Sequence, residues 1–254
     1  MMAEKTLSEV WRGIAFERGH GDYMPFRIGA VGADGTKLVG TTGFFRQPQF
    51  QRRIMGHMAN ETKAGRDVSL FCVPSSVGCA PLSFAMMGEL KGAFYNAGKA
   101  SIVTTDIHQP FLNVLRDNLY PLDMLRPFPD SAIHMMEPQG KYAFKIRDDI
   151  HARVTALPAM DFRDYTPEKP FDLVDCCNLL QHLDGDLAEN VAKILSFAAS
   201  AAFFDRSKRV NEKAMDKAIS KAGYIPVTAE NAVNDPAVKD VLAKRRLNWV
   251  AHQS

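Results

Sequence analysis

The chain has 254 residues and a mass of 28.2 kDa, which is enough to bury the core of one large α/β domain or of two small ones. Its composition, 46% hydrophobic and 24% charged, excludes the disordered, collagen-like and coiled-coil classes of protein. The 31 Lys and Arg residues nearly balance the 29 Asp and Glu residues, which argues against a nucleic-acid partner and favours a small-molecule or protein substrate.

The N-terminal residues carry few signals of regular structure. One short helix is expected over residues 7–16, and a glycine-rich stretch follows at residues 29–43. Residues 1–40 are therefore expected to be an extension rather than an independent domain, and residues 41–254 are expected to form the main domain.

Further along the chain, short apolar runs alternate with amphipathic stretches. The first run, residues 67–74, predicts a buried strand, and it is followed by a loop and by a helix with Pro81 in its first turn. Residues 100–105 repeat the pattern as a second strand, and apolar residues from Phe111 onward continue as a helix. This order builds a parallel sheet with helices on both faces.

The second half of the chain extends the same pattern. Further strands are expected at residues 152–159, 171–176, 198–204, 224–227 and 247–252, and further helices at residues 187–195 and 215–222. Between the second and third strands, residues 121–150 contain four prolines, which disfavour helix, and residues 141–146 alternate as a strand does. The predicted fold class is an α/β, Rossmann-like, mostly parallel sheet with an antiparallel last strand and a small β insertion.

Two residues at predicted strand ends suit a nucleotide ligand. Gly78 follows the first strand, where a glycine lets backbone approach a ligand, and Asp106 ends the second strand, where a carboxylate accepts both hydroxyls of a ribose. Purely structural roles, a turn glycine for Gly78 and a helix-capping aspartate for Asp106, explain these two residues equally well. The absence of GxGxxG argues against a dinucleotide-binding oxidoreductase.

Four segments together form a more specific pattern. They are Thr42-Gly43-Phe44-Phe45-Arg46 ahead of the sheet, Gly78-Cys79-Ala80-Pro81-Leu82-Ser83 after the first strand, Thr105-Asp106 after the second, and Asp175-Cys176-Cys177-Asn178-Leu179 after the fourth. In this order, with the proline-rich insertion between strands two and three, residues 41–204 resemble the chemotaxis receptor methyltransferase (CheR-type) family. The resemblance implies a class I methyltransferase fold, with S-adenosylmethionine as cofactor and S-adenosylhomocysteine as product.

The resemblance also implies site residues. Thr42 and Arg46 would lie at the sulfonium end of the cofactor, Asp106 at the ribose, Asp161 and Phe162 beside the adenine, and Ser76, Gly78, Asn178 and Leu179 elsewhere along it. In an open parallel sheet ligands bind at the carboxyl ends of strands, where several of these residues fall in the predicted order. A helix N-cap for Asn178 and a surface ion pair for Arg46 are the simpler alternatives.

The sequence departs from the family pattern at several of these positions. Where the family has G-E-E-P-Y-S, two acidic residues near the cofactor's methionine end are replaced by Cys79 and Ala80. Cys177 and His182 replace an arginine and a tyrosine after the fourth strand, and Gly40 replaces an asparagine. The helical N-terminal domain with which family members meet receptors has no counterpart in residues 1–40. These departures leave open a catalytically silent binding or signalling module.

Arg46 and His182 are the predicted catalytic residues. Methyl transfer needs in-line approach of a nucleophile in a water-poor pocket. A carboxylate acceptor is already ionised at neutral pH, and Arg46 would hold it bidentately. A hydroxyl or amine acceptor must lose a proton, for which His182 is the candidate base, although a structural histidine is the simpler reading. The acceptor, a small molecule or a protein, is not specified further, and neither is the oligomeric state.

Cysteine usage and hydropathy indicate the compartment. The four cysteines suit buried thiols rather than a disulfide scaffold, and neither they nor the histidines have the spacing of a metal site. The N-terminal residues lack the apolar run of a signal peptide, and no segment reaches the about 18 apolar residues of a membrane span. A cytoplasmic protein without a metal or membrane site is expected.

Overall fold

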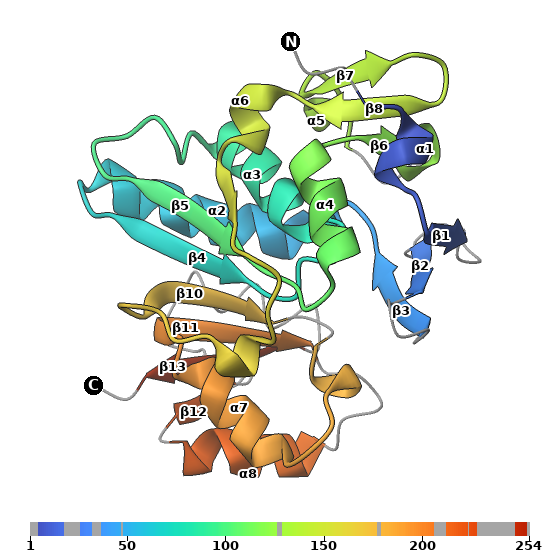
Figure 1. Cartoon of the computed structure of the whole chain (residues 1–254). Coiled ribbons are helices and arrows are strands. Elements are labelled where there is room, and N and C mark those ends of the chain that lie inside the picture. The colour runs from blue at the N-terminus through green and yellow to red at the C-terminus, as the bar shows by residue number, and fades with distance from the viewer. Residues whose placement is uncertain are drawn as a thin grey trace.

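A seven-stranded sheet runs through the molecule in the spatial order β12-β13-β11-β10-β4-β5-β9 (Figure 1). The computed structural model describes residues 5–17, 26–31, 37–46, 48–125, 129–176, 179–205, 212–222, 224–227 and 247–252. The sheet consists of β4 (Val68–Cys72), β5 (Ala100–Thr104), β9 (Val154–Ala156), β10 (Phe171–Cys176), β11 (Ala198–Asp205), β12 (Tyr224–Val227) and β13 (Leu247–His252).

The strand directions match the fold class expected from the sequence. Strands β9, β5, β4, β10 and β11 pair in parallel, whereas β13 pairs antiparallel with both β11 and β12. The predicted strands of the sheet and the antiparallel direction of the last one are confirmed. Because the chain moves from β4 outward through β5 to β9 and then returns to β10, the strand order reverses between β4 and β10. Open α/β sheets bind ligands at such a reversal.

Helices cover both faces of this sheet. The helices α2 (Pro48–Lys63), α3 (Cys79–Lys91) and α4 (Gln109–Asp117) share one apolar core with Leu70 and Cys72 of β4. Phe71 of the same strand points the other way, into a second core with α7 (Leu187–Leu195) and α8 (Glu212–Lys221). The alternation of side chains along a strand therefore gives β4 two buried faces, as expected for a central parallel strand.

The N-terminal residues form a small separate sheet instead of the expected longer helix. The predicted helix over residues 7–16 is wrong beyond its first turn, because α1 (Leu7–Val10) ends early and β1 (Ile14–Glu17) begins four residues later. Gly13 lies between them at φ +76°, a conformation that ends a right-handed helix and that glycine adopts without strain. β1 pairs with β2 (Phe26–Val31), which pairs with β3 (Lys37–Thr42), both antiparallel. Strand β3 therefore spans residue 40, which was the expected boundary between the N-terminal extension and the main domain.

Helix α2 was not among the elements expected from the sequence. Its first residue is Pro48, and its buried face is apolar at spacings of three to four residues, through Phe50, Ile54, Met55 and Met58. Many polar side chains between these positions dilute the apolar signal. The helix covers the first core and brings its N-terminal turn to the carboxyl end of the sheet.

The expected β insertion is present between β5 and β9. It contains a three-stranded sheet in the order β6-β8-β7, and its elements are β6 (Tyr120–Pro121), η1 (Leu122–Leu125), α5 (Asp130–Ile133), β7 (Met136–Gln139), β8 (Ala143–Ile146) and α6 (Asp148–His151). The predicted strand at residues 141–146 corresponds to β8. Tyr120 and Phe144 are fully buried, so the insertion is part of the first core rather than a loose loop.

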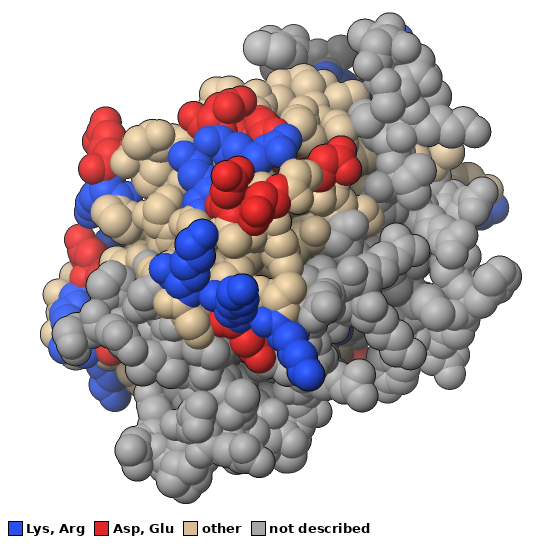
Figure 2. Space-filling view, turned by 90° about the horizontal axis from the view of Figure 1, so that it is seen from below, with Lys and Arg blue, Asp and Glu red and all other residues tan. Residues whose placement is uncertain are grey.

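The surface has mixed charge where the structure describes it. Figure 2 shows acidic and basic side chains side by side on the described part of one face, as the formal net charge of +2 implies. Among the helices that the structure describes, none combines the length and the hydropathy needed to cross a lipid bilayer.

Gly78 stands at the junction of the first loop and α3. It has φ +93°, and a Cβ atom added there would lie 2.5 Å from Cδ1 of Leu115 on α4. Leu115 is itself buried, so its side chain has little room to move away. The glycine therefore allows two helices to pack closely where the loop enters α3.

We expect Gly78→Ala to lower the free energy of unfolding by roughly 2 to 5 kcal/mol, from the left-handed backbone and the overpacking against Leu115. Gly92→Ala is the matched control, since Gly92 has φ +69° but an added Cβ would meet nothing within 4 Å. It should cost only about 1 to 2 kcal/mol. Urea unfolding of the two variants measures the difference. Equal losses would show that the contact with Leu115 is unimportant.

Candidate active site

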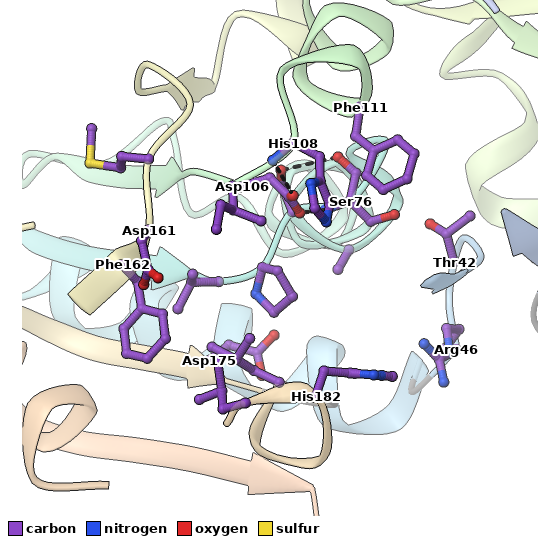
Figure 3. Close-up of a pocket in the computed structure, with 18 of the residues that line it drawn as sticks. Thr42, Arg46, Ser76, Asp106, His108, Phe111, Asp161, Phe162, Asp175 and His182 are labelled. Carbon is purple, nitrogen blue, oxygen red and sulfur yellow. Dashed lines mark hydrogen bonds between the residues drawn. The ribbon is translucent and has the colours of Figure 1, made fainter. Parts of the chain in front are cut away.

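A cavity of about 390 Å³ opens at the carboxyl ends of β4, β5 and β10, where the strand order reverses. Eight of the ten residues expected at the site line it, namely Thr42, Arg46, Ser76, Asp106, Asp161, Phe162, Leu179 and His182. Figure 3 shows Asp106 and Ser76 on one side, Asp175 and His182 on the opposite side, and Thr42 with Arg46 at one end. The fold therefore brings together, around one cavity, eight expected residues that lie far apart in the chain.

Two expected residues are not among the lining residues. Gly78 is buried beside Leu115, as described above, and it contributes to the shape of the loop rather than to the wall. Asn178 lies outside the residues that the structure describes. Its expected role after β10 stays a prediction.

Asp106 is the best-defined polar group of the cavity. Its Oδ2 accepts a hydrogen bond from the backbone N–H of Ser76 at 2.8 Å, and its Oδ1 accepts one from the N–H of His108 at 2.9 Å. Burial raises the pKa of the Asp106 carboxyl, while these two N–H groups oppose the shift by favouring the ionised form. The carboxylate is 5% exposed and stands at the carboxyl end of β5, in position to accept hydroxyl donors from a ligand.

The loop after β4 contributes Ser76. This residue has φ +51°, which is uncommon for a residue other than glycine, and its backbone N–H donates a hydrogen bond to Asp106. Within the described residues, the buried Oγ of Ser76 has no hydrogen-bond partner. A buried hydroxyl without a partner is costly, and it suits a site in which a ligand supplies the missing bond.

The segment before α2 holds Arg46 at the end of the cavity. Phe44 and Phe45 precede it and are almost completely buried, and the N–H of Phe45 donates to Oγ of Ser83 on α3 at 2.9 Å. Phe44 packs edge-on against Tyr120 of the insertion, with ring centroids 5.1 Å apart. These contacts fix the backbone from which the half-buried Arg46 side chain extends into the cavity.

The opposite end of the cavity is bordered by η2 (Phe162–Asp164). The Asp161 carboxylate caps this turn by accepting from the N–H of Arg163, and the guanidinium Nε of Arg163 donates to both carboxylate oxygens at 3.0 and 2.9 Å. These hydrogen bonds hold the pKa of Asp161 below its usual range. Phe162 is 4% exposed and belongs to the second core. An apolar wall and a neutralised carboxylate suit a flat, uncharged ring.

The end of β10 and the turn after it complete the cavity. Leu179 is buried, and the turn η3 (Leu180–His182) carries His182 with its side chain exposed at the opening. Asp175, the fifth residue of β10, is 5% exposed and also lines the cavity. Cys72 on the neighbouring strand β4 is paired with Asp175 in register, and its Sγ donates a hydrogen bond to Oδ2 of Asp175 at 3.5 Å.

Asp175 and Gln51 are polar lining residues to which the sequence assigned no role. Asp175 lies within the buried apolar strand β10, and a carboxylate in such a strand is unusual, but the sequence does not show which side chains surround it. Gln51 belongs to α2, a helix that was not expected, so its direction was not predictable. Over the part of the chain that the structure describes, no group of three or more His, Cys, Asp or Glu side chains is arranged to hold a metal ion.

Comparisons with known proteins extend these observations. Among solved structures, the chain is similar to a TehB-like SAM-dependent methyltransferase from Corynebacterium glutamicum, with 10% identity, a TM-score of 0.45, and coverage of 82% of this chain and 100% of that chain. It is also similar to the N-methyltransferase NodS from Bradyrhizobium japonicum, solved with S-adenosyl-L-homocysteine, with 8% identity, a TM-score of 0.42, and coverage of 82% and 89%. A search of curated proteins found no match.

The family comparison is the decisive one. The model of the CheR methyltransferase SAM-binding domain matches residues 40–202, which is more than half of the 254 residues. The matched range starts in β3, ahead of the segment that holds Arg46, and ends in β11, and it contains all the expected site residues. The chain therefore belongs to the CheR methyltransferase family and is an S-adenosylmethionine-dependent methyltransferase.

Proposed function

We propose that the protein transfers the methyl group of S-adenosylmethionine to a carboxylate of a small-molecule or protein acceptor, held by Arg46. The observation that carries this proposal is the rigid segment around Phe44 and Phe45, which directs one guanidinium into the end of the cavity. A guanidinium on a fixed backbone suits bidentate binding of a planar carboxylate. Residues 41–254, with the insertion at 121–150, are proposed as the catalytic domain.

The residues of the cavity fit the cofactor. Its volume of about 390 Å³ lies in the range typical of small-molecule sites, roughly 300 to 1,000 Å³. Asp106 would accept the ribose hydroxyls, and the Ser76 hydroxyl would gain the partner that it lacks among the described residues. Phe162 and the neutralised Asp161 would border the adenine. Leu179 and Asn178 would line the cofactor behind β10.

When bound, S-adenosylmethionine supplies an electrophilic methyl group on a positively charged sulfur. Arg46 would orient the acceptor carboxylate so that one of its oxygens faces that methyl group, and Thr42 lines the same end of the cavity. Phe50 and Phe84 form an apolar wall that keeps water away from the acceptor. A carboxylate with a pKa of about 4.3 is ionised at neutral pH, so this reaction needs no general base.

A hydroxyl or amine acceptor is the second candidate, and the position of His182 favours it. This side chain is exposed at the opening of the cavity, where it would take a proton from an incoming nucleophile. The two candidates differ in whether the rate depends on an ionisable base. They are therefore separable by the pH dependence of the chemical step.

We expect Asp106→Asn to weaken binding of S-adenosylhomocysteine roughly 10- to 100-fold, because hydrogen bonds to a charged group are lost. Titration calorimetry measures the affinity, and thermal unfolding checks that the variant is folded. Methylthioadenosine and its deoxyribose analogue provide a sharper comparison, since the parent should prefer the ribose form and the variant should not. A variant that keeps the parent's preference would remove Asp106 from the ribose site.

Arg46→Lys keeps the positive charge but loses the planar pair of donors. We expect kcat/KM for a carboxylate acceptor to fall about 10-fold or more, with little change in affinity for S-adenosylhomocysteine. Arg52→Lys, an exposed position on α2, is the matched control and should keep the parent's rate. Equal rates for the Arg46→Lys variant and the parent would contradict bidentate binding. A parallel loss of S-adenosylhomocysteine affinity would assign Arg46 to the cofactor instead.

The pH dependence of single-turnover rates separates the two acceptor classes. For a carboxylate acceptor we expect a flat profile above about pH 5.5, where a glutamate-like group is more than about 90% ionised, in the parent and in His182→Gln alike. A rising limb between about pH 6 and 7 that disappears in His182→Gln, with a loss of about 10²- to 10⁴-fold, would instead establish His182 as a base and a hydroxyl or amine as the acceptor.

A further inference from the structure

The loop after β4 contains two residues in the left-handed region of backbone conformation. Ser76 has φ +51° and Gly78 has φ +93°, and the fully buried Val77 lies between them. The carbonyl of Val77 accepts a hydrogen bond of 3.0 Å from the phenolic hydroxyl of Tyr120, the first residue of β6. A side chain of the β insertion therefore helps to hold this loop in its conformation.

Tyr120 also contacts the segment that carries Arg46. Its ring lies edge-on against that of Phe44, with centroids 5.1 Å apart and an interplanar angle of 80°. The next residue, Phe45, has φ +50°, a conformation that is unfavourable outside glycine and persists only where the surroundings hold it. The N–H of Phe45 donates to Oγ of Ser83 on α3. The contacts with Ser83 and Tyr120 together keep this segment in place.

Tyr120 is itself fixed within the molecule. It is fully buried and pairs with Phe144 between β6 and β8, with the two ring centroids 5.7 Å apart. The carbonyl of the preceding residue, Leu119, accepts from the indole Nε1–H of Trp11 at 2.8 Å. Burial raises the pKa of the Tyr120 hydroxyl well above its ordinary value, so the hydroxyl keeps its proton and stays a donor. The side chain is therefore a rigid link.

This one side chain joins two parts of the chain that border the cavity. Tyr120 does not belong to the described residues that line the cavity, so it acts through Val77 and Phe44. We propose that Tyr120 is a positioning residue, which sets the spacing between the loop that borders the cofactor and the segment that directs Arg46 towards the acceptor.

The spacing matters because the loop contributes Ser76 to the cavity, whereas the segment contributes Thr42 and Arg46. A displacement of about 1 Å between reacting groups can lower a rate about 100-fold. The role of Arg46 in this pairing rests on the proposed function, so the first two measurements below use no acceptor.

Tyr120→Phe is the informative variant, because it removes the hydroxyl and keeps the ring that packs against Phe44 and Phe144. Trp11→Phe is the matched control. It also removes one hydrogen bond to a backbone carbonyl of the insertion region, that of Leu119, which is not part of the loop after β4. Thermal unfolding checks that both variants are folded.

Amide hydrogen exchange in the ligand-free protein measures local opening of both segments. The N–H groups of Ser76 and Phe45 are both donated in hydrogen bonds, so each reports on its own segment. We expect Tyr120→Phe to speed exchange at Ser76 about 5- to 20-fold, as for the loss of one buried hydrogen bond, and at Phe45 about threefold or more. Trp11→Phe should leave both rates within about 1.5-fold of the parent.

Adenosine tests the link itself, because it has the ribose and the adenine of the cofactor and lacks the sulfonium end. In the parent, we expect bound adenosine to slow exchange at Ser76 and, through Tyr120, at Phe45 as well, although Phe45 belongs to the segment at the arginine end of the cavity (Figure 3). In Tyr120→Phe it should slow exchange at Ser76 alone. A purely structural role of Tyr120 would lower the unfolding temperature and leave the response at Phe45 unchanged.

A rate measurement adds the acceptor. Single-turnover methyl transfer from S-adenosylmethionine to propionate, a minimal carboxylate probe, gives methyl propionate and S-adenosylhomocysteine. We expect Tyr120→Phe to lower this rate at saturating concentrations about 10- to 100-fold, and Trp11→Phe to keep the parent's rate. A parent protein that transfers no methyl group to propionate would contradict the proposed acceptor, whereas the exchange measurements would still decide the role of Tyr120.

The positioning role is overturned if exchange at Phe45 is unchanged in Tyr120→Phe, which would leave the tyrosine a support of the loop alone. It is also overturned if Trp11→Phe speeds exchange at Ser76 and Phe45 as much, since the effect would then come from a general loosening of the insertion. An adenosine response at Phe45 that survives in Tyr120→Phe would show that the link runs through other residues.

Discussion

The pairing of β4 with β5 on one side and with β10 on the other is the constraint on which the site depends. This pairing brings the ends of the three strands to one edge of the sheet. Two backbone hydrogen bonds of 2.9 Å continue the pairing beyond β4: the N–H of Val73 donates to the C=O of Asp175, and the N–H of Ser75 donates to the C=O of Thr105. The loop after β4 is thereby held between its neighbours. Asp106 then fixes the amide of Ser76 across the same gap, so the cavity is formed by the sheet itself.

The segment that carries Arg46 is attached to this frame from two directions. Ser83 of α3 accepts from the backbone of Phe45, and Tyr120 and Phe144 of the insertion enclose the ring of Phe44. The β insertion therefore helps to fix the position of the segment that carries Arg46 at the end of the cavity. A change in the packing of the insertion would shift the backbone near Arg46, where the acceptor is proposed to bind, because close-packed interiors transmit small displacements.

The seven-stranded sheet was predictable, because buried parallel strands appear as continuous apolar runs. The eight lining residues were predicted chiefly from the resemblance of four segments to a family pattern, and the meeting of strand ends at one edge supported only some of them, such as Asp106. The antiparallel β1 to β3 sheet was not predictable, since glycines weaken the alternating pattern of β2 and β3. Gln51 was missed because α2 was missed. Asp175 was missed because a carboxylate inside an apolar strand shows its surroundings only once Cys72 and Phe203 are placed beside it.

The strand order has a consequence for synthesis on the ribosome. β13 is the last strand of the sheet to be made, yet it lies inside the sheet, between β11 and β12. Until residues 247–252 emerge, the outer edge of β11 offers unpaired N–H and C=O groups beside a nearly complete cavity. An exposed edge of this kind invites pairing with other chains. The residues that line the cofactor cavity, all before residue 185, can thus assemble first, while protection of the β11 edge from aggregation waits for residues 247–252.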